Sequence, residues 1–379
     1  MQAVGILCLV LLALAGAGIA QAGMMDKIKE VMKKVKSIKA MKSKTTTSSE
    51  AAPLPHVPVI DIGSFFNGTK EERKKVAMQI GRAAEDIGFF VVTNHGVPDH
   101  IIEDMWRETS IFFDMDVKDK SKLTKPQDEY PFGYTGFKGE VLSAGKAVET
   151  GDKTKGAPPD LKEMFSLGPA NPNAGFPERL WPENEEFSFA WTNYYDTLAE
   201  LAANILRAFA ISLELPSENY FDQFIGHHAS ALRAINYPHV DEKPVPGQLR
   251  ASAHTDYGTI TILKADAPGL QVSKDKDPPT WIDVPYVEGA FIINLGDLMK
   301  RWTNDRWLST LHRVVNPDLG DACWNGGSTR RQSVAFFHNL DKDAVVENLM
   351  AEEALYEPIV AGDFLMKKHL ATQGITTDD

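Results

Sequence analysis

The spacing of hydrophobic residues predicts helices in the first half of the chain. Apolar side chains recur every third or fourth position between Lys70 and Ile87 and between Asp99 and Phe113, which is typical of amphipathic helices. Residues 187–213 carry the same pattern over a longer stretch. Two β-prone runs, at 57–61 and 88–93, lie among these helices.

After His227 the hydrophobic pattern changes. Short runs rich in Val, Ile, Thr and Phe alternate with turns of Gly, Pro and Asp, which favours an all-β core of the sandwich or jelly-roll type. Residues 125–180 have weak periodicity and are expected to form loops with short strands over a site. We therefore divide the chain into a signal peptide (1–22), a basic segment with a linker (23–56), an N-terminal helical region (57–220) and a jelly-roll core (221–375), with 57–375 as one structural unit.

The first 22 residues contain no charged side chain, and an apolar or small-residue run extends from Val4 to Ala20. The small-x-small site that ends at Ala22 predicts a secretory signal peptide cleaved after that residue. An uncleaved membrane anchor is the alternative, although this run is short for spanning a bilayer. We expect entry into the secretory pathway, or plastid import through the endoplasmic reticulum if the source is an alga with complex plastids.

The charge of the 379-residue chain is unevenly distributed. Residues 23–44 hold eight Lys against two acidic residues, a charge of +6, so the rest of the chain sums to −18 within a total of −12. The basic residues share a helical pattern with apolar ones, which predicts membrane-surface contact by residues 24–42, or a solvated linker. The acidic body argues against nucleic acid as a partner. Cleavage would remove Cys8 and leave Cys323, so no disulfide framework is expected.

Two histidines and an aspartate carry the strongest chemical signal. Side chains two positions apart in an extended chain point to the same face, so the imidazole of His254 and the carboxylate of Asp256 should converge. His312, in another β-prone run, is the candidate third ligand, although a structural histidine is the alternative. This ligand set leaves three octahedral positions open and suits non-haem Fe(II), whereas zinc prefers a four-coordinate site.

A second group of polar residues predicts a pocket for a carboxylate. Arg331 and Ser333 share one face of a predicted strand, where a guanidinium and a hydroxyl form a carboxylate clamp. Arg233 and Tyr237 share a face of an upstream strand, so Tyr237 could donate to the same carboxylate and Arg233 could meet a charged substrate. The alternatives are a surface arginine at 331, a core aromatic at 237 and a rim salt bridge at 233.

Taken together, these motifs resemble the iron(II)- and 2-oxoglutarate-dependent oxygenases of the isopenicillin N synthase-like family. The resemblance spans roughly residues 55–375 and rests on the stretches 88–97, 254–263, 269–272, 289–297, 301–304, 309–314 and 331–337. It implies a double-stranded β-helix, the cupin-like jelly roll, with helices packed against it. The segment 316–330 is longer than the family pattern and is interpreted as a loop insertion.

The resemblance also implies roles for individual residues. His254, Asp256 and His312 would be the iron ligands, while Arg331 and Ser333 would bind the distal carboxylate of 2-oxoglutarate, assisted by Tyr237. No catalytic residue beyond the metal centre is expected. The implied cofactors are Fe(II), 2-oxoglutarate as cosubstrate and O₂, with ascorbate as a stimulant. Five other histidines, at 95, 227, 228, 239 and 338, are expected to be structural.

The implied activity is oxidation of a small molecule of secondary metabolism by a monomeric dioxygenase. Hydroxylation, desaturation or oxidative cyclisation would accompany the decarboxylation of 2-oxoglutarate to succinate. Two alternatives stay open at this stage. One is an Fe(II) oxidase of the same fold that does not use 2-oxoglutarate, and the other is a non-catalytic small-molecule binding protein.

Overall fold

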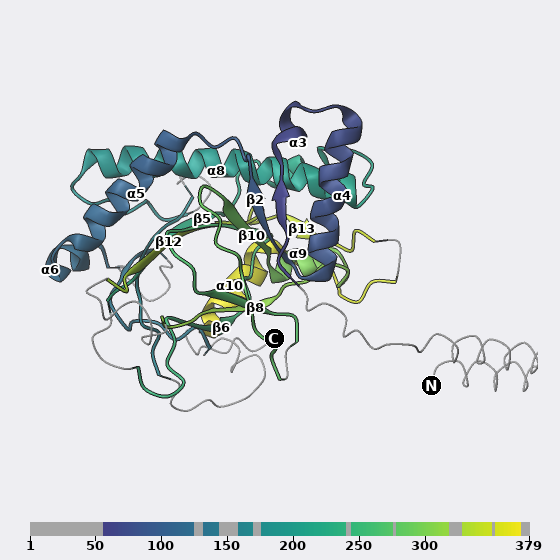
Figure 1. Ribbon diagram of the computed structural model, residues 1–379. Coiled ribbons are helices and arrows are strands. Elements are labelled where there is room, and N and C mark those ends of the chain that lie inside the picture. Colours follow the sequence, from purple (N-terminus) through teal and green to yellow (C-terminus); the bar gives the residue numbers. More distant parts are fainter. Residues whose placement is uncertain are drawn as a thin grey trace, which may run out of the picture. The chain divides into compact units, whose positions relative to one another are not determined.

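A long helix and two β-sheets organise the chain (Figure 1). The computed structural model describes residues 56–372 except 125–131, 144–157, 170–175, 240–243, 276–277, 318–327 and 351–352. These residues belong to one compact unit, Pro55–Asp379. The predicted signal peptide, the basic segment and most of the 316–330 insertion lie outside the described residues. Within the described part, no helix combines the length and apolar character needed to cross a membrane.

The larger sheet has eight strands in the order β1-β2-β10-β7-β12-β5-β4-β3. All neighbours in it are antiparallel except β1 and β2, which are parallel. Its strands are β1 (Val59–Asp61), β2 (Phe89–Thr93), β3 (Gly133–Thr135), β4 (Glu163–Leu167), β5 (Ala231–Tyr237), β7 (Ile260–Ala265), β10 (Phe291–Leu295) and β12 (Arg331–His338).

The smaller sheet has four strands in the order β6-β11-β8-β9. They are β6 (Ala251–His254), β11 (Leu311–Val314), β8 (Leu270–Ser273) and β9 (Ile282–Asp283), while β13 (Val345–Val346) and β14 (Ile359–Val360) form a separate pair. Two sheets that pack together, with helices outside, form the jelly roll that the sequence predicts. The fold prediction is therefore confirmed.

The three predicted helices are present, and side-chain capping fixes the start of two of them. α4 (Lys70–Asp86) starts at a capping box made by Thr69 and Glu72, and α5 spans Asp99–Asp114. α8 (Glu185–Ser212) starts earlier than predicted because the side chain of Asn184 accepts bonds from the first backbone amides. The sequence analysis did not predict the shorter helices α3 (Gly63–Asn67), α6 (Val117–Lys120), α9 (Asp297–Trp302) and α10 (Ala361–Thr372), or the 3-10 turns at Ser121–Leu123 and Tyr220–Phe224.

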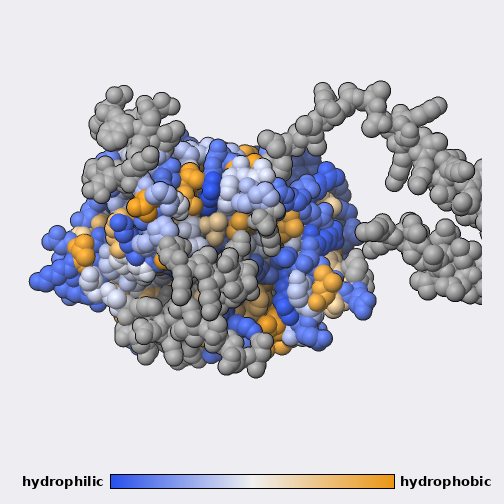
Figure 2. All heavy atoms as spheres, turned by 90° about the horizontal axis from the view of Figure 1, so that it is seen from below, coloured by the Kyte–Doolittle hydropathy of each residue, from blue (hydrophilic) through white to orange (hydrophobic). Residues whose placement is uncertain are grey.

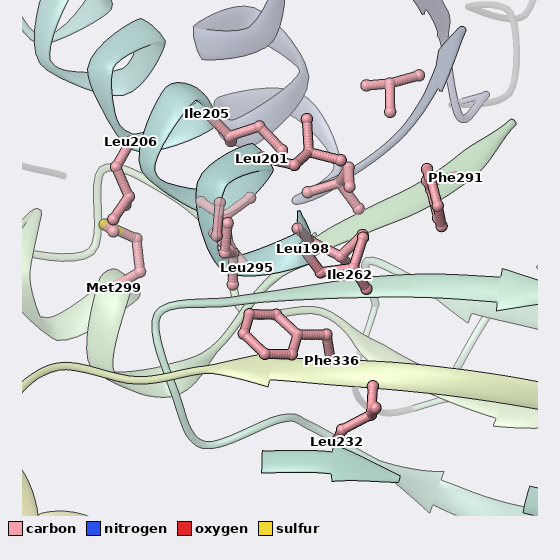
Figure 3. Close-up of a cluster of buried hydrophobic side chains, with 14 of the residues drawn as sticks. Leu198, Leu201, Ile205, Leu206, Leu232, Ile262, Phe291, Leu295, Met299 and Phe336 are labelled. Carbon is pink, nitrogen blue, oxygen red and sulfur yellow. The ribbon is translucent and has the colours of Figure 1, made fainter. Parts of the chain in front are cut away.

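Hydrophobic side chains are gathered inside the unit rather than on the face seen in Figure 2. That face is mainly hydrophilic, and its hydrophobic residues form small, separate groups. The main cluster lies between α8 and the larger sheet, as Figure 3 shows. There Leu198, Leu201 and Ile205 of α8 meet Ile262, Phe291 and Phe336 of the sheet. Burial of this cluster fixes the sheet against the helices.

A second cluster lies between the two sheets and includes Tyr237, Val272 and Val314. Alternation along each strand separates the two faces of the larger sheet. On β12, for example, Val334 and Phe336 belong to the main cluster, on the outer face of the larger sheet beside α8. Arg331 and Ser333 therefore point to the inner face, which faces the smaller sheet. The inner face therefore combines apolar packing with buried polar side chains.

Gly88 lies between α4 and β2, in close contact with the segment that leads into β11. Its backbone has φ +68°, and a Cβ atom there would lie 2.3 Å from the carbonyl oxygen of Leu308. The neighbouring contacts are hydrogen bonds from the amide of Leu308 to the carbonyl of Ala84 (3.0 Å) and from Oγ1 of Thr310 to the carbonyl of Ile87 (2.6 Å). Glycine is required here both by the backbone conformation and by this close approach.

We expect the Gly88→Ala substitution to lower the free energy of unfolding by about 3 kcal/mol or more, because it adds overlap with the Leu308 backbone to conformational strain. Gly96→Ala is the matched control, since Gly96 has φ +77° but no atom within 4 Å of its Cβ position. That variant should lose about 1–2 kcal/mol from strain alone. Chemical denaturation measures both values, and equal losses would contradict this account of Gly88.

Candidate metal centre

Strand pairing brings the two predicted histidine ligands together. β6 and β11 are antiparallel neighbours, and His254 and His312 lie directly opposite each other. Their ring centroids are 4.2 Å apart. Because directly opposed side chains project to the same side of a sheet, both imidazoles point to one place.

Asp256 joins them by a route that differs from the prediction. The prediction placed His254 and Asp256 on one extended strand, but β6 ends at His254 and Asp256 lies in the loop that follows. Hydrogen bonds from the amide of Asp297 to the carbonyl of Asp256 (2.8 Å) and from Leu298 to Tyr257 (3.1 Å) hold this loop against the start of α9. The carboxylate therefore reaches the histidines by a turn of the backbone, not by strand alternation.

The three side chains form a site that could hold a metal ion. The Oδ1 atom of Asp256 lies 3.8 Å from Nε2 of His254 and 3.6 Å from Nε2 of His312. All three ligand atoms lie within 4.8 Å of one another. Within the described part of the chain, this is the one group of three or more such residues with that geometry. Two imidazoles and one carboxylate are the donor set of the facial triad that binds non-haem Fe(II).

Hydrogen bonds fix which atom each histidine offers. Nδ1 of His254 lies 2.8 Å from the carbonyl oxygen of Ser252, and Nδ1 of His312 lies 3.0 Å from that of Thr310. A carbonyl oxygen only accepts, so both Nδ1 atoms carry the proton and both Nε2 atoms keep a free lone pair. Burial and the neighbouring His312 lower the pKa of His254 to about 3, which keeps its imidazole neutral.

Asp256 is oriented in the same way. Its Oδ2 atom accepts hydrogen bonds from Oγ1 of Thr261 (2.6 Å) and Nδ2 of Asn294 (2.7 Å), and Oδ1 remains for a metal. Burial opposes ionisation of this carboxyl. The two imidazoles and these two hydrogen bonds outweigh burial and hold the pKa of Asp256 below its ordinary value. The site thus offers one carboxylate oxygen and two imidazole nitrogens to a metal ion.

The predicted carboxylate clamp lies on the inner face of the larger sheet. Arg331 and Tyr237 are opposite each other on β12 and β5, and the guanidinium of Arg331 lies 5.2 Å from the centre of the Tyr237 ring. Nε of Arg331 donates to the carbonyls of Ala267 (3.0 Å) and Pro268 (3.1 Å). Its Nη1 atom is buried and has no hydrogen-bond acceptor among the described residues. Ser333, on the same strand face, is also buried.

Arg233 lies earlier on β5 and on the same inner face as Tyr237. Its Nε atom donates to Oγ of Ser166 on β4 (2.9 Å), and its guanidinium lies 5.5 Å from the centre of the Phe337 ring. Nη1 of Arg233 is 3.9 Å from Oε1 of Glu140. Arg233 therefore has a neighbouring acidic residue that the sequence analysis did not anticipate.

The histidines expected to be structural are outside the metal centre. His95, for example, makes contacts with the carbonyl of Gly289 (2.8 Å) and the amide of Val97 (3.2 Å), which tie the loop after β2 to the turn before β10. The sequence analysis did miss Thr261 and Asn294, which orient Asp256. A polar residue inside an otherwise apolar strand, as at Asn294, was the available signal.

Profiles of two protein families match the chain. Residues 57–184 match the N-terminal region described as "non-haem dioxygenase in morphine synthesis", and residues 229–340 match the 2OG-Fe(II) oxygenase superfamily. A 2-oxoglutarate-Fe(II) type oxidoreductase of Metarhizium rileyi is 30% identical over 85% of this chain and 93% of its own length. A proline hydroxylase of Petromyces alliaceus is 31% identical over 83% of this chain and 98% of its own.

Solved structures of similar proteins show the same architecture. A full-length protein of Neurospora crassa, solved in complex with α-ketoglutarate, has a TM-score of 0.74 and 29% identity, and the match covers 85% of this chain and 98% of that one. The same Neurospora crassa protein in complex with α-ketoglutarate and thymine gives a TM-score of 0.72 with 29% identity, covering 85% and 99%.

We expect the Asn294→Ala substitution to raise the dissociation constant for Fe(II) by about tenfold or more, because Asp256 loses the donor that orients its carboxylate. Anaerobic titration calorimetry with Fe(II) measures this constant. Asn204→Ala is the control, since Asn204 bonds to the backbone of its own helix at Glu200. Equal affinity in the Asn294 variant and the unsubstituted protein would show that this hydrogen bond does not support the metal centre.

Proposed function

The chain belongs to the 2OG-Fe(II) oxygenase superfamily, and on that premise we propose that it oxidises a C–H bond of a small molecule at His254, Asp256 and His312. It is an oxidoreductase that uses Fe(II), 2-oxoglutarate and O₂. The observation that carries the proposed site is the convergence of two free Nε2 atoms and one free Oδ1 atom within 4.8 Å. Bound iron supplies the oxidising chemistry: in a hydroxylation one oxygen atom of O₂ enters the substrate, the other enters succinate, and 2-oxoglutarate releases CO₂.

The side chains of the centre would hold iron on one side. Two imidazoles and one carboxylate would occupy three positions and leave the others for 2-oxoglutarate and O₂. The hydrogen bonds to Ser252, Thr310, Thr261 and Asn294 keep the three donors in place before the metal binds. These residues therefore orient the three metal ligands and provide one negative charge to the metal.

Arg331 supports a binding site for 2-oxoglutarate on the larger sheet, opposite the histidines of the smaller sheet. A fully buried guanidinium with an unpaired Nη1 atom is costly unless a ligand supplies an acceptor. The distal carboxylate of 2-oxoglutarate fits this need because it accepts from Arg331 and from the neighbouring Ser333. Tyr237, whose ring lies beneath the guanidinium, completes the proposed cosubstrate pocket. An oxidase that ignores 2-oxoglutarate, or a protein that only binds a ligand, is less consistent with the family.

We further propose that the substrate is a small polar molecule of secondary metabolism. The names of two similar proteins mention small polar molecules: one is called a proline hydroxylase, and the Neurospora crassa protein was solved with thymine. In this chain Arg233, on the inner face with 24% of its side chain exposed, is positioned to bind an acceptor group such as a carboxylate. Among the described residues, the exposed large hydrophobic side chains are spread along the chain from Val59 to Met366, which favours a monomer.

The family assignment predicts that O₂ uptake by the purified protein requires both Fe(II) and 2-oxoglutarate and yields succinate in equal amount. Asp256→Ala should abolish succinate formation because the anionic metal ligand is lost. Oxygen electrode traces and succinate quantification measure these quantities. Rapid O₂ uptake with substrate but without 2-oxoglutarate would instead favour the 2-oxoglutarate-independent oxidase.

The proposed pocket predicts that Arg331→Lys raises the half-saturating concentration of 2-oxoglutarate by about tenfold or more, because an ammonium cannot replace the two-pronged guanidinium. Iron affinity should stay unchanged. Arg330→Lys is the neighbouring control, since Arg330 pairs with Asp114 at 2.6 Å and with Asn236 at 2.8 Å. An Arg331 variant with unaltered 2-oxoglutarate saturation would place the cosubstrate elsewhere.

For the N-terminal segment we propose a cleaved secretory signal that ends at Ala22, followed by membrane-surface contact through residues 24–42. Expression of the full chain in a eukaryotic host should then give a mature protein that begins at Gly23. N-terminal sequencing of the purified product checks this. A product that retains Cys8 would indicate an uncleaved leader.

A further inference from the structure

A cluster of four charged side chains lies at the inner face of the larger sheet, near β6. Lys162 directly precedes β4, and its Nζ atom lies 2.6 Å from Oε2 of Glu140 and 3.6 Å from Oδ2 of Asp160. Only 3% of the Lys162 side chain is exposed, and Asp160 is fully buried. Arg233, described above, is the fourth member. Two buried and two half-buried charges in one cluster need a structural or functional reason.

Asp160 fastens the cluster to the strand that carries His254. Its Oδ1 atom accepts hydrogen bonds from the amide (2.9 Å) and Oγ (2.5 Å) of Ser252. The carbonyl of Ser252 in turn accepts the Nδ1 proton of His254. The Oδ2 atom of Asp160 accepts from the amide of Leu142, two residues beyond Glu140. The cluster is therefore built onto the wall of the metal centre, and it holds the segment that carries Glu140.

Glu140 is held as a carboxylate. Burial alone would raise the pKa of Glu140, but Lys162 and Arg233 outweigh burial and lower it to about 2. Lys162 engages Oε2, so Oε1 faces Arg233. At neutral pH an acceptor with a full negative charge thus stands beside the guanidinium.

Arg233 keeps donors available next to that acceptor. Within the described part of the chain, its Nε atom is satisfied by Ser166, while Nη1 is 3.9 Å from Glu140, beyond hydrogen-bond distance. The guanidinium lies over the ring of Phe337, which limits its movement. The pair therefore presents a charged donor and a charged acceptor 3.9 Å apart, with neither used up by the other.

We propose that Arg233 and Glu140 together recognise the substrate. The part of the substrate that they bind has no net charge and carries a hydrogen-bond acceptor for Arg233 close to a hydrogen-bond donor for Glu140. The inference rests on the proposed function and names its substrate class. The two acids and two bases of the cluster balance, so the cluster has no net positive charge to attract an anion. Glu140, which stands beside Arg233, would repel a purely anionic substrate. The short distance between the paired atoms requires that the two substrate groups lie close together.

Two kinds of small molecule offer this chemistry. An α-amino acid or imino acid offers its carboxylate to Arg233 and its ammonium to Glu140. A cyclic amide, such as a pyrimidine base, offers its carbonyl and N–H instead. The two differ in charge, so replacing Glu140 by Gln distinguishes them, because the Gln oxygen still accepts from an amide but no longer attracts an ammonium.

The test measures succinate formed by the full chain with Fe(II), 2-oxoglutarate and one added compound. One arm uses the proteinogenic L-amino acids, each with its N-acetyl and methyl ester derivative, and the other uses uracil, thymine and hydantoin. We expect at least one compound to raise succinate formation above the substrate-free rate. For an amino acid, Glu140→Gln should lower kcat/KM by about tenfold or more, and for a cyclic amide by less than about threefold.

Two further variants keep the test decisive. Arg233→Lys leaves the Lys162–Glu140 pair in place and should raise KM for the active compound by about tenfold while the half-saturating 2-oxoglutarate concentration stays constant. Glu186→Gln, an exposed position at the start of α8, should change nothing. Unfolding midpoints of all variants establish that the fold is retained.

Three results would overturn the inference. N-acetyl amino acids that work as well as the free amino acids, with no effect of Glu140→Gln, would show that Glu140 does not bind substrate. N-acetyl amino acids that work better than the free amino acids would show that the site takes anions. No response to any compound, with normal substrate-free succinate formation, would reject the substrate class but not the proposed function. Absence of all succinate formation would reject the proposed function itself.

Discussion

The pairing of β6 with β11 sets the direction of both histidine donors in the metal centre. His254 and His312 lie opposite each other in this pair, although 57 residues separate them in the chain. A slip of one residue would turn one imidazole to the other face of the sheet and destroy the site. The register is held on the far side of β11 by four residue pairs with β8, and on β6 by the bonds between Asp160 and Ser252. The same contacts that fix the strands therefore also fix the ligands.

The two faces of the larger sheet have different roles: the outer face stabilises the fold, and the inner face carries the polar side chains of the proposed binding site. Its outer face packs against α8 in the main hydrophobic cluster, which supplies most of the apolar burial. Its inner face holds Tyr237, Arg331 and Arg233 among a smaller set of apolar residues. An unpaired Nη1 atom on Arg331 costs stability, and such a departure from complete pairing is typical of a functional site.

Much of this arrangement could be predicted from the sequence, because it is local or repeated. The periodicity of α4, α5 and α8 depends on residues within a few turns, and capping explains the early start of α8 at Asn184. The β-prone runs and the family-like motifs predicted His254, Asp256 and His312 as ligands of one metal ion. The structure brings these three side chains together.

What the sequence did not predict depends on contacts between distant segments. Asp256 lies in a loop fixed by the start of α9, which strand alternation cannot foresee. The link from Asp160 to Ser252 joins residues 92 positions apart, and no periodic signal marks Glu140 or Lys162. Thr261 and Asn294 orient Asp256 only because β7 and β10 are neighbours in the sheet. These residues gain their roles from topology rather than from local pattern.

One wall of the jelly roll would hold iron, and the opposite wall would hold the cosubstrate. A crystal structure of the protein grown without oxygen, with Fe(II) and 2-oxoglutarate, tests both parts through anomalous scattering at the iron edge. The account predicts one anomalous peak bonded to Nε2 of His254, Nε2 of His312 and Oδ1 of Asp256, and a ligand carboxylate on Nη1 of Arg331. An iron peak elsewhere, or a cosubstrate that leaves Arg331 unpaired, would contradict it.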